Sequence, residues 1–193
     1  MESYILMILG TVLVNNIILA QFLGVCPFLG VSGKMSTAVG MSAAILFVMT
    51  LATIVTTLIQ NYLLVPLEMG YLQTVVFIIV IASLVQVVEI VLKKISPPLY
   101  SALGIFLPLM TTNCAVLGIA ITVTLKNFNL IDATLFTVFT ALGFGIAIII
   151  FAGIREQLEL VNIPKGMKGI PIAFITVGIL ALAFMGFANL DKF

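Results

Sequence analysis

Two cysteines, Cys26 and Cys114, are the residues of this chain best suited to hold a metal, and each begins the pattern Cys-x-x-Leu-Gly. Cys114 stands 88 positions after Cys26, close to half of the 193-residue length. A lone cysteine in an apolar helix is usually a small buried hydrophobe, whereas a thiolate is a ligand for iron, zinc or copper. The local chemistry beside each cysteine, a predicted helix break, favours the metal-binding interpretation.

Counting ligands then constrains the assembly. Tetrahedral iron sites, whether a single iron or an iron–sulfur cluster, use four thiolates, and this chain has two cysteines and no histidine. The remaining two thiolates must come from a second copy or from a homologous partner. A redox centre placed inside a membrane has one obvious use, which is to relay electrons from one face to the other.

Each cysteine stands beside a predicted helix break. Pro27 directly follows Cys26 and fits the first position of a new helical segment, which places Cys26 near its N-cap. Pro108 cannot donate a hydrogen bond to the carbonyl of Gly104, so we expect a kinked or interrupted helix ahead of Cys114. The free N–H groups and the positive dipole end of a helix start stabilise a thiolate.

The composition identifies the environment of these cysteines. Hydrophobic residues make up 63% of the chain, charged residues make up 8%, and the mean hydropathy is +1.36. Soluble domains carry about 25% charged residues, so a soluble fold, a disordered tail and a nucleic-acid binder are excluded. The charged residues leave six uncharged runs, each long enough for one membrane-spanning helix: 3–33, 35–67, 69–88, 95–125, 133–154 and 169–190.

These runs predict an all-α integral membrane protein with six transmembrane helices in a single membrane domain, 1–193. Each cysteine pattern is followed by two further apolar spans, which suggests two three-helix repeats, about 1–94 and 95–193, with interrupted first and fourth helices. Because three is odd, the second repeat is inverted relative to the first. The expected helices lie near 4–25, 37–60, 71–92, 101–122, 131–153 and 170–189.

Basic residues predict the orientation of the chain. With these spans, one side of the membrane holds Lys126 and Lys192, and the other side holds the remaining six basic residues. The positive-inside rule assigns the richer side to the cytoplasm, so both termini should lie on the outer face. We also expect helix 1 to stay as an anchor, because Glu2 stands where a signal peptide would be basic. The six cytoplasmic residues are Lys34, Lys93, Lys94, Arg155, Lys165 and Lys168.

Several longer motifs surround the cysteines: Leu13-Val14-Asn15-Asn16, Phe22-Leu23-Gly24-Val25-Cys26-Pro27-Phe28, Pro97-Pro98-Leu99-Tyr100, Leu103-Gly104-Ile105-Phe106-Leu107-Pro108-Leu109, Thr112-Asn113-Cys114-Ala115 and Ala152-Gly153-Ile154-Arg155-Glu156. Through these motifs the whole chain resembles the RnfA/NqrE family. Its members are membrane subunits of the Rnf ferredoxin:NAD oxidoreductase and of the related sodium-pumping NADH:quinone oxidoreductase. The short segment 61–70 is closer to the RnfA branch.

The resemblance implies a function as a subunit of a redox-driven ion translocase in the bacterial cytoplasmic (inner) membrane. Cys26 and Cys114 would supply half of the ligands of a [2Fe–2S] cluster shared with an RnfE-like homologous subunit of opposite orientation. Electron transfer through it would be coupled to movement of Na⁺ or H⁺. The other expected partners are membrane lipid and the Rnf subunits RnfB, RnfC, RnfD and RnfG. We expect no substrate chemistry within the isolated chain.

Further polar residues near the predicted breaks have two interpretations. Thr112 and Asn113, directly before Cys114, could donate hydrogen bonds to cluster sulfurs or line the ion route, as could Asn15 and Asn16 in helix 1, and the pair beside Cys114 is the better candidate. The simpler interpretation is hydrogen bonding between helices.

An alternative function of another class is also compatible with the sequence. The chain could be a small-solute transporter or membrane scaffold built on inverted repeats, without a redox centre.

Overall fold

The computed structural model describes residues 10–14, 16–66, 70–95, 109, 112–161, 164 and 166–186. Within these ranges the regular structure is entirely helical, with no strand. In chain order, with π- and 3-10 segments written η, the helices are η1 (Gly10–Val14), α2 (Val25–Val31), α3 (Met35–Ile59), η2 (Gln60–Leu64), η3 (Gly70–Leu72), α4 (Gln73–Ile95), α7 (Cys114–Leu125), α8 (Leu130–Glu159) and α9 (Ile170–Met185).

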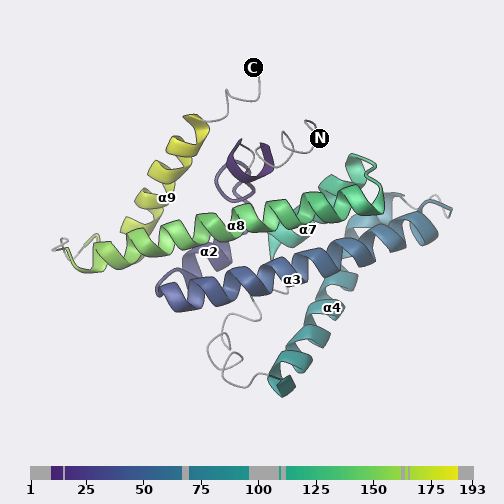
Figure 1. Cartoon of the computed structure of the whole chain (residues 1–193), viewed down its shortest axis with the longest axis horizontal. Coiled ribbons are helices and arrows are strands. Elements are labelled where there is room, and N and C mark those ends of the chain that lie inside the picture. The colour runs from purple at the N-terminus through teal and green to yellow at the C-terminus, as the bar shows by residue number, and fades with distance from the viewer. Residues whose placement is uncertain are drawn as a thin grey trace.

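Helices α3 and α8 form the central pair, antiparallel and side by side along the length of the molecule (Figure 1). Small residues let the two backbones approach, because a Cβ added to Gly145 would lie only 3.2 Å from Cβ of Ser42. The buried hydroxyl of Thr137 donates to the hydroxyl of Thr53 at 3.0 Å. Lipid tails are as apolar as leucine, so close packing and such hydrogen bonds hold membrane helices together.

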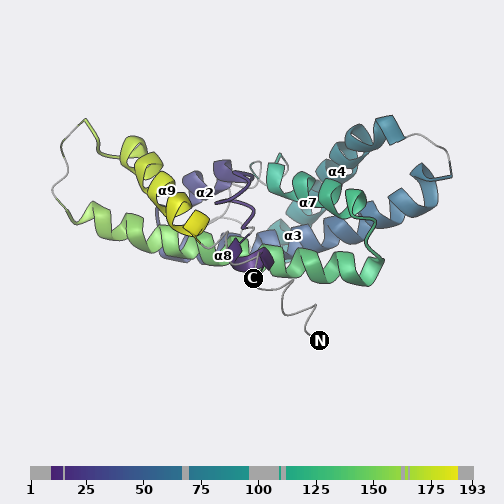
Figure 2. The ribbon, with the colours of Figure 1, turned by 90° about the horizontal axis from the view of Figure 1, so that it is seen from above.

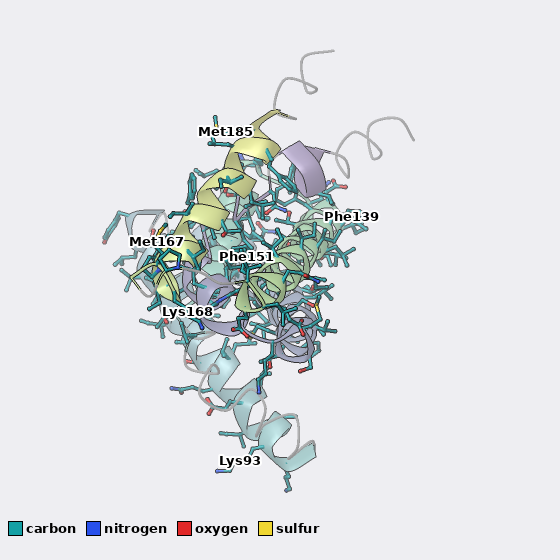
Figure 3. All side chains as sticks on the ribbon, turned by 90° about the vertical axis from the view of Figure 1, so that its left-hand side faces the viewer. Lys93, Phe139, Phe151, Met167, Lys168 and Met185 are labelled. Atoms are coloured by element: carbon teal, nitrogen blue, oxygen red, sulfur yellow. The ribbon has the colours of Figure 1, made fainter. Side chains whose placement is uncertain are left out.

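The remaining helices pack around this pair. Helices α2 and α7 lie on the same side of α8 (Figure 2), and α4 and α9 extend in opposite directions from the α3–α8 pair (Figure 1). Phe28 of α2 and Phe151 of α8 are fully buried, and their stacked ring centroids are 4.5 Å apart. Figure 3 shows Phe151 among the helices, with Lys93 and Met185 at the periphery.

The first predicted span differs from the structure. The sequence predicts one helix near 4–25 that breaks at Pro27, but the described backbone has the π-helix η1, then turns, and a new helix from Val25. Phe22 and Gly24 both have positive φ, 54° and 80°, a backbone conformation that ends a right-handed helix. The break therefore precedes Pro27, which lies in the first turn of α2, where a missing N–H costs no intrahelical bond.

Asn16 fixes the segment after η1 to α8. Its side-chain amide donates to the carbonyl of Gly143 at 2.9 Å and to that of Val12 at 3.3 Å, and its oxygen accepts from the backbone N–H of Ile18. The interhelical interpretation of Asn16 is thus confirmed. Asn15 lies outside the described residues.

The described helices have the length and composition of membrane spans. Met35–Leu64, Gly70–Val91 and Leu130–Glu159 are long and apolar enough to cross the hydrocarbon, and α7 and α9 are shorter apolar helices. Outward-facing side chains are apolar as well, with Ile79, Ile90 and Leu182 more than half exposed. The chain is an all-α integral membrane protein, as predicted. The six-span count, the inverted repeat and the single-domain boundary stay predictions, since 1–9 and 96–108 lie outside the described residues.

Gly143 provides a test of this packing. A Cβ at this position would lie 3.1 Å from Cα of Val12, a backbone atom that cannot rotate away. We expect Gly143→Leu to destabilise the protein by about 1–3 kcal/mol, the usual cost of overpacking. Thermal unfolding of the purified protein in nanodiscs measures the effect. Gly178→Leu is the matched control, because a Cβ there meets nothing within 4 Å; equal losses in the two variants would contradict the packing.

Candidate metal centre

Cys114 is the first residue of α7. Asn113 is the N-cap of this helix, and its side-chain oxygen accepts the backbone N–H of Ala115 at 3.0 Å. This capping bond satisfies one of the free amides at the helix start and fixes the position of the first turn. The thiol of Cys114 is partly exposed. Pro108 itself lies outside the described residues, but Thr112 and Asn113 are not helical, so the helix expected near 101–122 is interrupted ahead of Cys114, as predicted.

The two residues proposed as neighbours of a ligand differ in their surroundings. Asn113 is buried, and its side-chain Nδ2 has no hydrogen-bond partner within the described parts of the chain. A buried amide donor without an acceptor is uncommon in native proteins and calls for an acceptor beyond the described residues. Thr112 is exposed.

A hydrogen bond joins the two cysteine motifs. The backbone N–H of Gly24 donates to Sγ of Cys114 at 2.9 Å, across 90 residues of sequence. Only glycine fits here, because φ is +80° and a Cβ would meet Phe144 Cε2 at 2.8 Å and Ala115 Cβ at 3.0 Å. N–H···S hydrogen bonds of this kind tune the potentials of iron–sulfur sites.

Cys26 lies two residues after Gly24, in the first turn of α2, and its side chain is exposed. The N-cap of α2 is Gly24 and Cys26 is the second residue of the helix, which confirms the prediction that Cys26 lies near the N-cap, although Pro27 is the third helical residue and not the first. Pro27 and Phe28 are buried on the face toward the bundle. Cys26 therefore points outward from a short helix that is anchored by its neighbours.

Arg155 of α8 holds the other end of α2. Its NH1 group donates to the carbonyl of Leu29 at 2.7 Å and to the hydroxyl of Ser32 at 2.9 Å. From the sequence, Arg155 is expected in the basic cytoplasmic loop and in one of the motifs shared with the RnfA/NqrE family, with no contact to α2. In the structure it is half-buried and binds a carbonyl in the last turn of α2, where helices leave carbonyls unpaired. No local pattern in the sequence signals this contact, which joins positions 126 residues apart.

The donor set of the site is two thiols. They are not bonded to each other, and the described residues contain no group of three or more Cys, His, Asp or Glu side chains that could hold a metal ion. A tetrahedral metal centre at this position therefore needs ligands from another chain. One exposed and one partly exposed thiol, at the adjoining starts of α2 and α7, leave room for such a partner.

The fold and the site together define a class of protein, helical membrane proteins that present two thiols at the joined starts of two helices. A sequence model of the Rnf-Nqr family, described as "Rnf-Nqr subunit, membrane protein", matches residues 4–191. The chain belongs to this family.

The relatives match this chain over nearly the whole length of both sequences. The chain is 52% identical over 188 residues to the A subunit of the Na⁺-translocating ferredoxin:NAD⁺ oxidoreductase complex of Acetobacterium woodii, covering 97% of this chain and 98% of that protein. It is 51% identical to the A subunit of the ion-translocating oxidoreductase complex of Azoarcus sp., with 100% of both chains covered. The corresponding protein of Syntrophotalea carbinolica is 52% identical, with 98% of both chains covered.

The contact at Gly24 can be tested by placing an alanine there. The residue has φ +80° and ψ 24°, in the left-handed region, and a Cβ would meet Phe144 Cε2 at 2.8 Å and Ala115 Cβ at 3.0 Å. We expect Gly24→Ala to cost about 1–2 kcal/mol of stability for the backbone conformation and about 1–3 kcal/mol more for the close contacts. Thermal unfolding in nanodiscs measures the total. A loss no larger than the cost of the backbone conformation would show that Gly24 is not closely packed against α7 and α8.

Proposed function

We propose that this chain is the membrane subunit of an ion-translocating ferredoxin:NAD oxidoreductase that relays electrons through a [2Fe–2S] cluster shared with a homologous partner subunit. The observation that carries the proposal is the hydrogen bond from Gly24 to Sγ of Cys114, which joins the two cysteine motifs. The relatives named as the A subunit of such complexes support the same assignment.

The residues at this place fit an iron–sulfur cluster. Cys26 and Cys114 would supply two of its four thiolate ligands, and an RnfE-like subunit would supply the others. The amide Nδ2 of Asn113 has no partner among the described residues and lies one residue from Cys114, so it is a suitable donor to a cluster sulfur. Gly24 already donates to the ligand sulfur itself. When bound, the cluster would accept and release one electron at a time.

The protein around the cysteines would hold the ligands and restrict access of water. Asn113 fixes the first turn of α7, and Arg155 together with the stacked Phe28 and Phe151 fixes α2 against α8. Ligands held by two anchored helices change position little between oxidation states. The buried aromatic rings also keep the environment apolar, a property that sets cluster potentials.

The coupled ion and the location belong to the same proposal. The name of the Acetobacterium woodii relative specifies Na⁺, and the name of the Azoarcus sp. relative specifies only an ion. We therefore propose coupling to Na⁺ or H⁺ in the bacterial inner membrane, with both termini on the outer face. The six-to-two distribution of basic residues between the predicted loops supports that orientation. The other Rnf subunits, RnfB, RnfC, RnfD and RnfG, would complete the path between soluble electron carriers.

Replacing either cysteine tests the ligand assignment. In the purified complex, Cys26→Ser and Cys114→Ser should each abolish one electron paramagnetic resonance signal of the reduced protein and lower its iron content, because a serine hydroxyl is a poor substitute for a thiolate. Val25→Ser is a control that adds a hydroxyl in the same turn of α2 and keeps both thiols.

Retention of every signal in both cysteine variants would refute the assignment. An iron-free, colourless protein that still transports a solute into vesicles after both cysteines are changed to alanine would instead support a transporter without a redox centre.

A further inference from the structure

A pocket of about 170 Å³ lies away from the cysteines, between the end of α3 with η2 and the loop that joins α7 to α8. No charged side chain is among its lining residues in the described part of the chain. Its polar lining consists of neutral side chains that each carry an oxygen: Thr57, Gln60, Asn61, Thr124, Asn127 and Asn129.

Two of these oxygens, Oγ1 of Thr57 and Oε1 of Gln60, are buried and have no hydrogen-bond partner among the residues that the structure describes. Thr57 is only 6% exposed. Thr50 on the same helix and Thr124 in the pocket donate to the carbonyl four residues earlier, as helical threonines commonly do. Thr57 does not. A buried polar atom left unpaired calls for a partner, and both atoms line the same pocket.

On balance, the helix dipoles around the pocket favour positive charge. The C-terminal ends of the α3–η2 segment and of α7, which carry partial negative charge, both lie at the pocket, against one N-terminus of opposite sign, that of α8. Asn129 is the N-cap of α8, but its side chain makes no capping bond. The segment Gln60–Leu64 is a π-helix, an irregularity that often occurs at functional sites.

The charge and the donor atoms of the lining residues limit the kinds of ligand that this pocket can bind. Carbonyl and hydroxyl oxygens are ligands for hard cations, and the side-chain oxygen of Gln60 can only accept or coordinate. A divalent ion would lack a neutralising carboxylate among the lining residues. The nearest basic residue of the loop, Lys126, is not part of the lining, and its Nζ lies over the rings of Phe128 and Phe136, 5.6 and 5.1 Å from their centroids.

We propose that this pocket binds one monovalent metal cation of the size of Na⁺, coordinated by Oγ1 of Thr57 and Oε1 of Gln60. Binding itself does not depend on the cluster. A role of this site in the path of the translocated ion rests on the proposed function.

Binding of radioactive ²²Na⁺ to the purified complex in nanodiscs, with choline as the balancing cation, tests the site. Thr57→Val keeps the shape of the side chain and removes the oxygen, so we expect the affinity of one site to fall about tenfold, equivalent to about 1.4 kcal/mol. Gln60→Leu should do the same, and Thr57→Ser should retain binding.

Thr50→Val is the matched control, since it removes a hydroxyl two turns earlier on α3 that bonds to Leu46 and lies outside the pocket. Unchanged number and affinity of Na⁺ sites in both Thr57→Val and Gln60→Leu would overturn the proposal and indicate a pocket that holds only water. The paramagnetic signals should be unchanged in these variants, whereas cysteine substitutions should remove one. The cation-site proposal can therefore be rejected without rejecting the cluster proposal, and the reverse also holds.

Discussion

The close approach of Gly24 to the start of α7 is the constraint on which the rest of the site depends. The left-handed φ of this residue ends the first apolar segment, its lack of a side chain admits Phe144 and Ala115, and its N–H reaches Sγ of Cys114. Any other residue would separate the two helix starts. The α3–α8 pair supplies the rigid surface against which both helices are aligned.

Most of the helices could be predicted from the sequence. A long apolar run between two charged residues has few structures other than a helix available to it in a membrane. The spans expected at 37–60, 71–92 and 170–189 correspond to α3, α4 and α9 within a few residues, and the span at 131–153 corresponds to α8, which continues to Glu159. The repeated pattern predicted both cysteines as metal ligands, and ligation stays a prediction, although a hydrogen bond joins Gly24, close to Cys26, to Cys114. Asn113 was proposed from its position beside Cys114, and the structure adds that its amide is unpaired among the described residues.

The remaining features depend on contacts between distant residues. Pro27 suggested the break in the first run, yet the chain breaks earlier, because the tight packing at Gly24 decides the backbone conformation there. In the sequence, Arg155 looks like the other basic residues of the loops. The structure shows that its side chain donates to the carbonyl of Leu29 near the end of α2. Thr57 is indistinguishable in sequence from the threonines whose hydroxyls bond to their own helix. Only the three-dimensional structure shows that its oxygen is unpaired among the described residues.

Helix α7 connects the two sites described above. It begins at Cys114 and ends at Leu125, beside the neutral pocket, so its 12 residues span about 18 Å. Its dipole favours negative charge at the first end and positive charge at the second. One negative charge gained at the cysteine end would attract a cation at the far end by about 1 kcal/mol, if an effective dielectric constant of about 20 applies. That energy amounts to about a fivefold change in affinity, so a single short helix would give reduction and cation uptake a direct electrostatic link.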